Sequence, residues 1–197
     1  MKRFLFVDGT NLYAGQFSLF GPDKYLVFSD FLRFIEDAIG KKFDKIFFYA
    51  SYSPRSKKLT EKEKIYLKNE YFFYKSAKLT PKLSFFRGYR SRKSGKEKGV
   101  DVKLACDLVS LSITGKYQEG FILSGDADFL EALFISKKYS KGIRQNIICL
   151  ENKIMYRGSY FFPTYVIRFT GKNLKIKEKY YKFIYLDQKF LVRDLNN

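Results

Sequence analysis

The feature that most constrains the fold is a repeated alternation of apolar, strand-like runs with helix-like patterns. The apolar runs occupy residues 2–7, 44–51, 82–89, 119–124 and 144–150. Helical periodicity is found between them, at residues 28–39, about 60–74, 100–113 and 129–138. Strands that alternate with helices pair in parallel through crossover connections, and the helices cover both faces of the sheet. The sequence therefore predicts an α/β fold with a parallel sheet of about five strands.

Local signals refine the boundaries of these elements. Thr60 and Glu63 have the spacing of a capping box, which predicts that a helix begins after Thr60. Gly40 is expected to end the helix at 28–39. After residue 150 the pattern weakens: residues 160–169 fit an edge strand or an extended arm, and residues 173–192 fit a terminal helix or a hairpin. We expect an α/β domain over 1–150 and a C-terminal extension over 151–197.

Composition removes several classes of chemistry. The chain has no histidine, which excludes histidine metal sites, Ser-His-Asp triads and imidazole bases. Cys106 and Cys149 lie in apolar runs without metal-ligand spacing, so buried free thiols are expected. The first apolar run ends at Asp8 and is too short for a signal peptide or a membrane span. These features indicate a cytoplasmic protein that does not associate with a membrane.

The charge is strongly positive, with 38 Lys and Arg against 20 Asp and Glu, a net charge of +18. Such a field attracts polyanions, of which nucleic acid is the commonest in a cytoplasm. A genome whose base composition favours lysine codons would produce the same excess without any role in binding. Bulk charge leaves both interpretations open.

Acidic residues follow two of the expected strands directly. Asp8 comes after the strand at 2–7, and Asp126 and Asp128 come after the strand at 119–124. Ligands of such sheets bind outside the carboxyl ends of the strands, so these carboxylates are expected at one edge. Asp8 also fits a turn that bonds its own backbone, and Asp126 fits a helix cap.

The helix at 100–113 carries two more aspartates. Its apolar residues form two arcs in projection, so we expect it to be mostly buried. Asp101 projects into the first arc and lies in the first turn, where backbone N–H groups favour an anion. We interpret Asp101 as functional, whereas Asp107 fits a partly buried structural hydrogen bond at least as well.

Three motifs together resemble a known family: VDGTNLY at the first strand, KGVDVKLACDLV at the middle helix and LSGDADF after the fourth strand. In order and spacing they are similar to the NYN domain of the PIN-like nuclease superfamily, in its LabA-like branch, over about residues 1–150. The resemblance implies a Rossmann-like sheet, an acidic pocket that binds Mg²⁺ or Mn²⁺, and hydrolysis of RNA phosphodiesters, with endonuclease action expected. The matching residues are Asp8, Asp101, Asp126 and Asp128, with Asn11 as the polar residue of the first motif.

The residue types agree with that chemistry. Crowded carboxylates raise one another's pKa values unless a hard cation neutralises them, and oxygen ligands suit Mg²⁺ or Mn²⁺ better than zinc. Asp126 and Asp128 each fit a direct ligand or a holder of water. Asn11, Ser124 and Lys98 are candidates for phosphate contact or for orienting the ligands.

The loop at 86–98 is rich in cations. It contains Arg87, Arg90, Arg92, Lys93, Lys96 and Lys98 beside Tyr89. Phosphates follow cations and an exposed aromatic ring can stack a base, so RNA, single-stranded or structured, is the expected partner. A solvated loop without a ligand is the alternative.

Two other functions fit part of the pattern. FVDGT resembles the end of the haloacid-dehalogenase phosphatase motif, but the nucleophile position holds Phe6 and the later acidic position holds Leu130. The second alternative is a catalytically silent RNA-binding or adaptor protein with the same fold. A homo-oligomer is compatible with either function.

Overall fold

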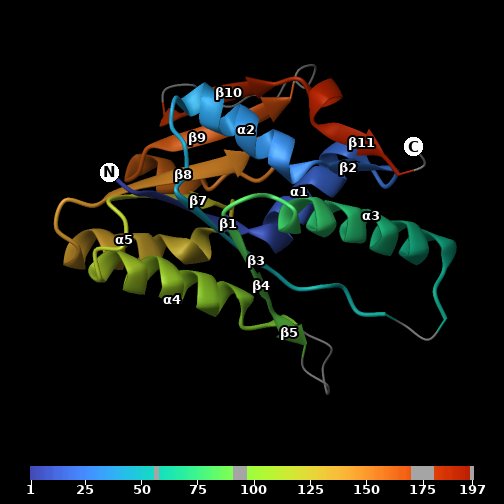
Figure 1. The fold of residues 1–197 in the computed structure, drawn as a ribbon, viewed down its shortest axis with the longest axis horizontal. Coiled ribbons are helices and arrows are strands. Elements are labelled where there is room, and N and C mark those ends of the chain that lie inside the picture. Colours follow the sequence, from blue (N-terminus) through green and yellow to red (C-terminus); the bar gives the residue numbers. More distant parts are fainter. Residues whose placement is uncertain (56–57, 91–96, 170–179, 196–197) are drawn as a thin grey trace.

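The fold is organised around one parallel sheet, which confirms the α/β prediction. The computed structural model describes residues 1–55, 58–90, 97–169 and 180–195. The sheet has seven strands in the order β10-β9-β8-β7-β1-β3-β4, and all its pairings are parallel (Figure 1). Its strands are β1 Arg3–Asp8, β3 Lys45–Ala50, β4 Leu83–Arg87, β7 Glu119–Leu123, β8 Arg144–Leu150, β9 Thr164–Phe169 and β10 Lys182–Leu186.

Among the described residues, five α-helices cover the two faces of the sheet (Figure 1). One face carries α1 Gly9–Phe20, α2 Phe28–Ile39 and α3 Glu61–Lys78. The other carries α4 Val100–Ile113 and α5 Leu130–Tyr139. The predicted capping box of Thr60 and Glu63 is confirmed at the start of α3, and Gly40 ends α2 in the left-handed conformation.

Each face of the sheet has its own hydrophobic core because strand side chains alternate. Leu5 and Val7 of β1 pack with residues of α1, α2 and α3, whereas Phe4 and Phe6 pack with residues of α4 and α5. Phe6 is fully buried, which agrees with the absence of a phosphatase nucleophile at that position. The central strands therefore read as continuous apolar runs, as expected for a sheet covered on both sides.

The strand order reverses at β1. From β1 the chain adds β3 and β4 on one side, then returns to add β7, β8, β9 and β10 on the other. The carboxyl ends of β1 and β7 therefore flank the topological switch point, where open α/β sheets form their ligand crevices.

Three parts of the fold differ from the sequence-based expectations. The predicted sheet of about five strands is too small, because β9 and β10 continue the sheet within the C-terminal segment. Neither a helix nor a hairpin accounts for residues 182–194: β10 is parallel to β9, and β11 (Val192–Asp194) pairs antiparallel with β2 (Lys24–Leu26). Helix α1 was missed because its glycines and polar residues give it a weak periodic signal.

The expectation that α4 is mostly buried was also wrong. Val100, Leu104 and Leu108 are buried against the sheet, but Asp101, Val102 and Cys106 are exposed. Only one arc of a helix can face the sheet, and the second apolar arc of α4 is not covered. Cys149 is a buried free thiol as expected, whereas Cys106 is free but exposed.

A buried ion-pair cluster holds the amino edge of the sheet. Glu119, at the start of β7, is 1% exposed and lies 2.9 Å from Arg3 Nε and 2.6 Å from Lys41 Nζ. Burial alone would raise the pKa of Glu119, but the hydrogen bonds from Lys41 and Arg3 outweigh it and hold the pKa below its ordinary value of 4.5. The ionised form is therefore stabilised by folding.

The stability that this carboxylate provides should depend on pH. A lowered folded pKa gives stability that is present above the unfolded pKa and is lost as pH falls through the folded pKa. We expect Glu119→Gln to lower the free energy of unfolding by about 1–3 kcal/mol at neutral pH. In urea unfolding, the difference from the wild type should shrink below pH 4.5. Glu61→Gln, which removes an exposed pair with Lys64, is the control, and a pH-independent difference for Glu119→Gln would contradict the assignment.

Candidate active site

The candidate site is centred on Asp8 at the carboxyl end of β1. Asp8 is 4% exposed, and its Oδ1 caps α1 by accepting a hydrogen bond of 2.9 Å from the Asn11 backbone N–H. The pKa of Asp8 is raised from 3.8 to about 6, mainly by burial; the hydrogen bonds from Asn11 and Ser124 oppose this rise, and the charges of Asp101 and Asp126 add to it. Asp8 therefore combines the predicted turn bond with a carboxylate that needs a positive partner when it is ionised.

Two polar residues connect the first motif, VDGTNLY, with the third, LSGDADF. Ser124 Oγ donates to Asp8 Oδ2 at 2.8 Å and accepts from the Asp126 backbone N–H at 3.0 Å. Asn11 Oδ1 accepts from the Gly125 backbone N–H at 3.2 Å. These bonds fix the turn after β7 against the turn after β1. Ser124 and Asn11 thus orient the acidic residues around them.

Gly125 permits a close approach of two backbones at the same place. A Cβ atom at this position would lie 2.1 Å from the carbonyl oxygen of Lys153. Because that neighbour is backbone, a side chain can fit only if one of the two segments moves. The turn that carries Asp126 is therefore packed directly against the chain that follows β8.

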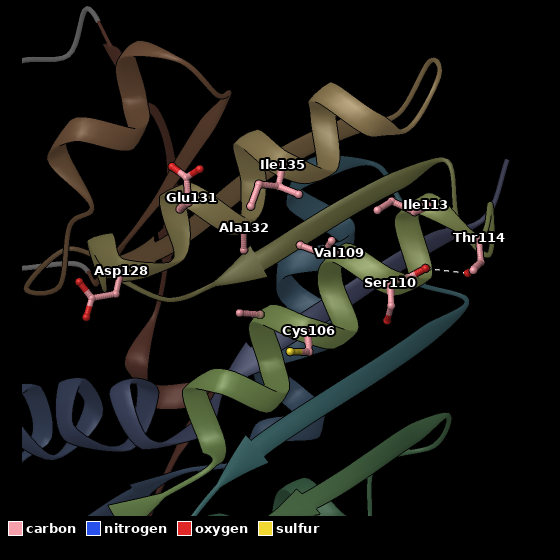
Figure 2. Close-up of a pocket in the computed structure, with 10 residues that line it drawn as sticks. Cys106, Val109, Ser110, Ile113, Thr114, Asp128, Glu131, Ala132 and Ile135 are labelled. Atoms are coloured by element: carbon pink, nitrogen blue, oxygen red, sulfur yellow. Dashed lines mark hydrogen bonds between the residues drawn. The ribbon is translucent and has the colours of Figure 1, made fainter.

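The two aspartates of the third motif, Asp126 and Asp128, have different positions. Asp126 is half-buried and caps a 3₁₀ turn at Ala127–Phe129, where its Oδ1 accepts from the Asp128 backbone N–H at 3.0 Å. This confirms that one residue of the pair is a cap. The Asp128 carboxylate is exposed, and Figure 2 shows it at one end of a groove, directed away from the apolar residues.

That groove lies between α4 and α5 and has a volume of about 670 Å³. Its walls are mainly apolar, with Val109, Ile113 and Ile135 among the residues that line it, and the exposed thiol of Cys106 belongs to it (Figure 2). Three residues of the second apolar arc of α4, Cys106, Val109 and Ile113, therefore line this groove, and of these Val109 also packs against the core.

Asp101 lies in the first turn of α4 and is exposed, not buried as expected, yet its charge acts on Asp8. Within the described ranges, no three His, Cys, Asp or Glu side chains form a group that could hold a metal ion. A cage built from protein ligands alone is therefore not formed by these residues. Mg²⁺ fits the donors nevertheless, since it binds through one or two carboxylates and retains several waters.

Asp107 has a structural partner on each side. It accepts a hydrogen bond of 2.8 Å from the Tyr49 hydroxyl and pairs with Lys103 one turn earlier on α4. The hydrogen bond from Tyr49 attaches α4 to β3, and the pair with Lys103 lies within α4. They match the structural alternative that the sequence left open for this residue.

The cationic loop is described only in part. Arg87 ends β4, and Tyr89–Arg90 (β5) pairs antiparallel with Glu97–Lys98 (β6). Arg92, Lys93 and Lys96 lie outside the described residues, and the positions of the Arg90 and Lys98 side chains are likewise outside the description. A cleft beside Arg87 also contains Tyr52, Tyr71 and Lys78, which sequence reasoning missed.

The fold and the acidic residues at the carboxyl ends of β1 and β7 define a class of protein. It is an open parallel α/β protein with acidic residues at its switch point. The family model of the NYN domain matches residues 2–155. The chain therefore belongs to the NYN family, whose members are nuclease-like hydrolases with a PIN-like fold.

Other comparisons bear on the fold alone. A crystal structure of a protein of unknown function from Vibrio parahaemolyticus is similar, with a TM-score of 0.55 and 14% sequence identity. The match covers 96% of this chain and 95% of that chain, so it includes the C-terminal strands. No curated protein matches the sequence. In the parts of the chain described above, no helix combines the length and hydropathy that a bilayer span requires.

Proposed function

We propose that this protein is a metal-dependent ribonuclease that hydrolyses RNA phosphodiester bonds, as an endonuclease, at the carboxyl ends of β1 and β7. The observation that carries the proposal is Asp8, a nearly buried carboxylate whose pKa is raised by burial and by the charges of Asp101 and Asp126. Such a group is stabilised by a cation at neutral pH. The NYN family membership supports the hydrolase class.

The proposed metal residues are Asp8, Asp101, Asp126 and Asp128, with Mg²⁺ or Mn²⁺ as the ion. When bound, a divalent ion of this kind supplies a water of lowered pKa and offsets charge on the leaving oxygen. The carboxylate of Asp8 lies at the switch point, and the hydrogen bonds of Ser124 and Asn11 fix its position relative to Asp126. No histidine is needed for these tasks.

The test is cleavage of a labelled RNA by purified protein. We expect cleavage that requires added Mg²⁺ or Mn²⁺, stops with chelator and resumes when the metal is restored in excess. A labelled strand with a blocked 5′ and 3′ end distinguishes internal cleavage from exonuclease action. If RNA that is bound to the protein remains intact with either metal, the proposed ribonuclease activity is refuted.

The second candidate is the RNA-binding or adaptor protein without catalysis. It is favoured by one observation, that no three acidic side chains within the described ranges form a group able to hold a metal. Bound but uncleaved RNA, with affinity unaffected by chelator, is the result that this candidate predicts.

A further inference from the structure

A cleft of about 780 Å³ lies beside the candidate active site, between α3 and the carboxyl ends of β3 and β4. Six of its side chains are cationic or aromatic, and none of the described residues that line it is acidic: Tyr52, Arg55, Tyr71, Lys78, Arg87 and Tyr89. Cations and aromatic rings around one concave surface are the combination that binds single-stranded nucleic acid.

Two of the cations of the cleft, Arg87 and Lys78, are held in place by aromatic rings. Arg87 Cζ lies 4.9 Å from the centre of the Tyr52 ring, and Lys78 Nζ lies 5.3 Å from the same ring. Tyr52 itself packs edge-on against the buried Tyr74, with ring centres 5.2 Å apart. Cation–π contacts orient the charged groups without neutralising them, so both remain able to bind phosphate.

Two other rings are presented to solvent. Tyr71 on α3 is 49% exposed and Tyr89 after β4 is 66% exposed, and both line the cleft. Exposed aromatic rings at a cationic surface offer faces on which bases stack. In a duplex the faces of the bases are covered by their neighbours, so these rings favour unpaired bases.

The backbone around the cleft is firmly anchored. Glu70, which is 3% exposed, accepts hydrogen bonds from the Ser53 backbone N–H at 3.0 Å and from Ser53 Oγ at 2.7 Å. The Gly88 backbone N–H donates to the Ala50 carbonyl at 2.9 Å, which ties the end of β4 to β3. The backbone at Ser53 and at Gly88 is therefore positioned before a ligand binds, which lowers the entropic cost of binding.

The cleft is also close to the acidic edge. Asp8 is in register with Tyr49 of β3, and Ala50 of β3 is in register with Arg87 of β4. Neighbouring strands are about 4.8 Å apart, so β4 lies about 10 Å from β1. A strand held in the cleft can continue toward Asp8 without leaving the carboxyl edge.

We propose that this cleft is a binding site for single-stranded nucleic acid, in which Tyr71 and Tyr89 stack bases and Arg55, Lys78 and Arg87 bind phosphates. The proposal deepens the ribonuclease function and rests on it for the role of the bound strand. Binding itself is independent of catalysis, so the two can be tested separately.

The binding test uses fluorescently labelled single-stranded RNA and DNA of one sequence, measured by anisotropy in chelator. We expect Tyr71→Ala and Tyr89→Ala each to weaken binding roughly 5- to 150-fold, the effect of losing one stacked base. Tyr71→Phe and Tyr89→Phe should bind like the wild type because they keep the ring. Tyr139→Ala is the matched control. Tyr139 is 61% exposed at the end of α5, where the chain leads to the amino end of β8, whereas the cleft lies at the carboxyl ends of the strands.

The cations are tested by the salt dependence of binding. Arg87→Ala and Lys78→Ala should each lower the slope of log K against log salt by about 0.7 on a single strand. Arg144→Ala, at the exposed amino end of β8, should leave the slope unchanged.

Three outcomes would overturn the cleft assignment. The first is that both tyrosine-to-alanine variants match Tyr139→Ala on RNA and on DNA. The second is that the same variants weaken a duplex as much as a single strand. The third is that the cation variants keep the wild-type salt slope. If RNA is never cleaved but binding still depends on Tyr71 and Tyr89, the ribonuclease proposal fails and the cleft stands.

Discussion

Asp8→Asn is expected to lower the rate of metal-dependent RNA cleavage at least about a hundredfold while the protein remains folded. The substitution removes the buried charge at the switch point that would hold the metal. An asparagine keeps the size of the side chain and an oxygen that can accept from the Asn11 backbone N–H, so α1 should retain its cap. Single-turnover cleavage with saturating metal is the measurement.

The same variant should be more stable than the wild type when no metal is present. In the folded chain the pKa of Asp8 is raised to about 6 from 3.8, so ionisation at neutral pH opposes folding by up to about 3 kcal/mol. We expect Asp8→Asn to gain on the order of 1 kcal/mol in chelator at pH 7, because part of the benefit is lost with the Ser124 hydrogen bond. The gain should be full above about pH 6 and disappear below pH 3.8, where the wild-type carboxyl is protonated in both the folded and the unfolded state.

Metal should reverse this order. Mg²⁺ or Mn²⁺ is expected to raise the melting temperature of the wild type but not of Asp8→Asn, because only a folded site that binds the ion gains stability from it. Asp187→Asn is the matched control: Asp187 also follows a strand and caps a helical turn, here the 3₁₀ turn after β10, four strand positions from β1. Undiminished cleavage by Asp8→Asn would show that the acidic site around Asp8 does not catalyse cleavage.

Gly125→Ala is expected to destabilise the protein by about 1–3 kcal/mol or more and to reduce cleavage together with stability. The added methyl group would lie 2.1 Å from the Lys153 carbonyl oxygen, so the turn after β7 or the segment after β8 must move. The hydrogen bond from the Gly125 N–H to Asn11 and that from the Asp126 N–H to Ser124 both start in this turn. Urea unfolding gives the stability, and cleavage at a temperature where the variant is fully folded isolates the effect on the site.

Gly142→Asn is the control for this substitution. Gly142 has a φ of 71°, and nothing lies within 4 Å of the position its Cβ would take. Asparagine tolerates that conformation, so little change is expected. Gly125→Ala with the stability and activity of the wild type would mean that Lys153 does not confine the turn.

Most of the sheet could be predicted from the sequence because its central strands are covered on both faces. The sequence predicts β8 with its observed bounds and α4 over Val100–Ile113, and only the burial expected for α4 is wrong. The edge elements were harder. β10 is joined to β9 through residues outside the description, and its pattern of buried and exposed residues fits several structures when read alone.

The site could be predicted in outline. Asp8 and Asp126 follow strands that are recognisable in the sequence, and parallel strands present their carboxyl ends at one edge. Ser124 was identified only as one candidate among several, because nothing in the sequence shows that its hydroxyl meets Asp8. Tyr71 and Lys78 were missed altogether, because on α3 they look like ordinary exposed helix residues.

The sequence by itself determined the fold class, the strands that lead to the acidic edge and the absence of imidazole chemistry. These depend on residue types and on local periodicity, which the chain carries at every position. Only the tertiary structure decided that Asp101 is exposed, that Gly125 adjoins Lys153 and that Tyr52, Tyr71 and Arg87 share one cleft. Those facts depend on how helices and strands far apart in the chain pack, because packing selects which face of each element is covered.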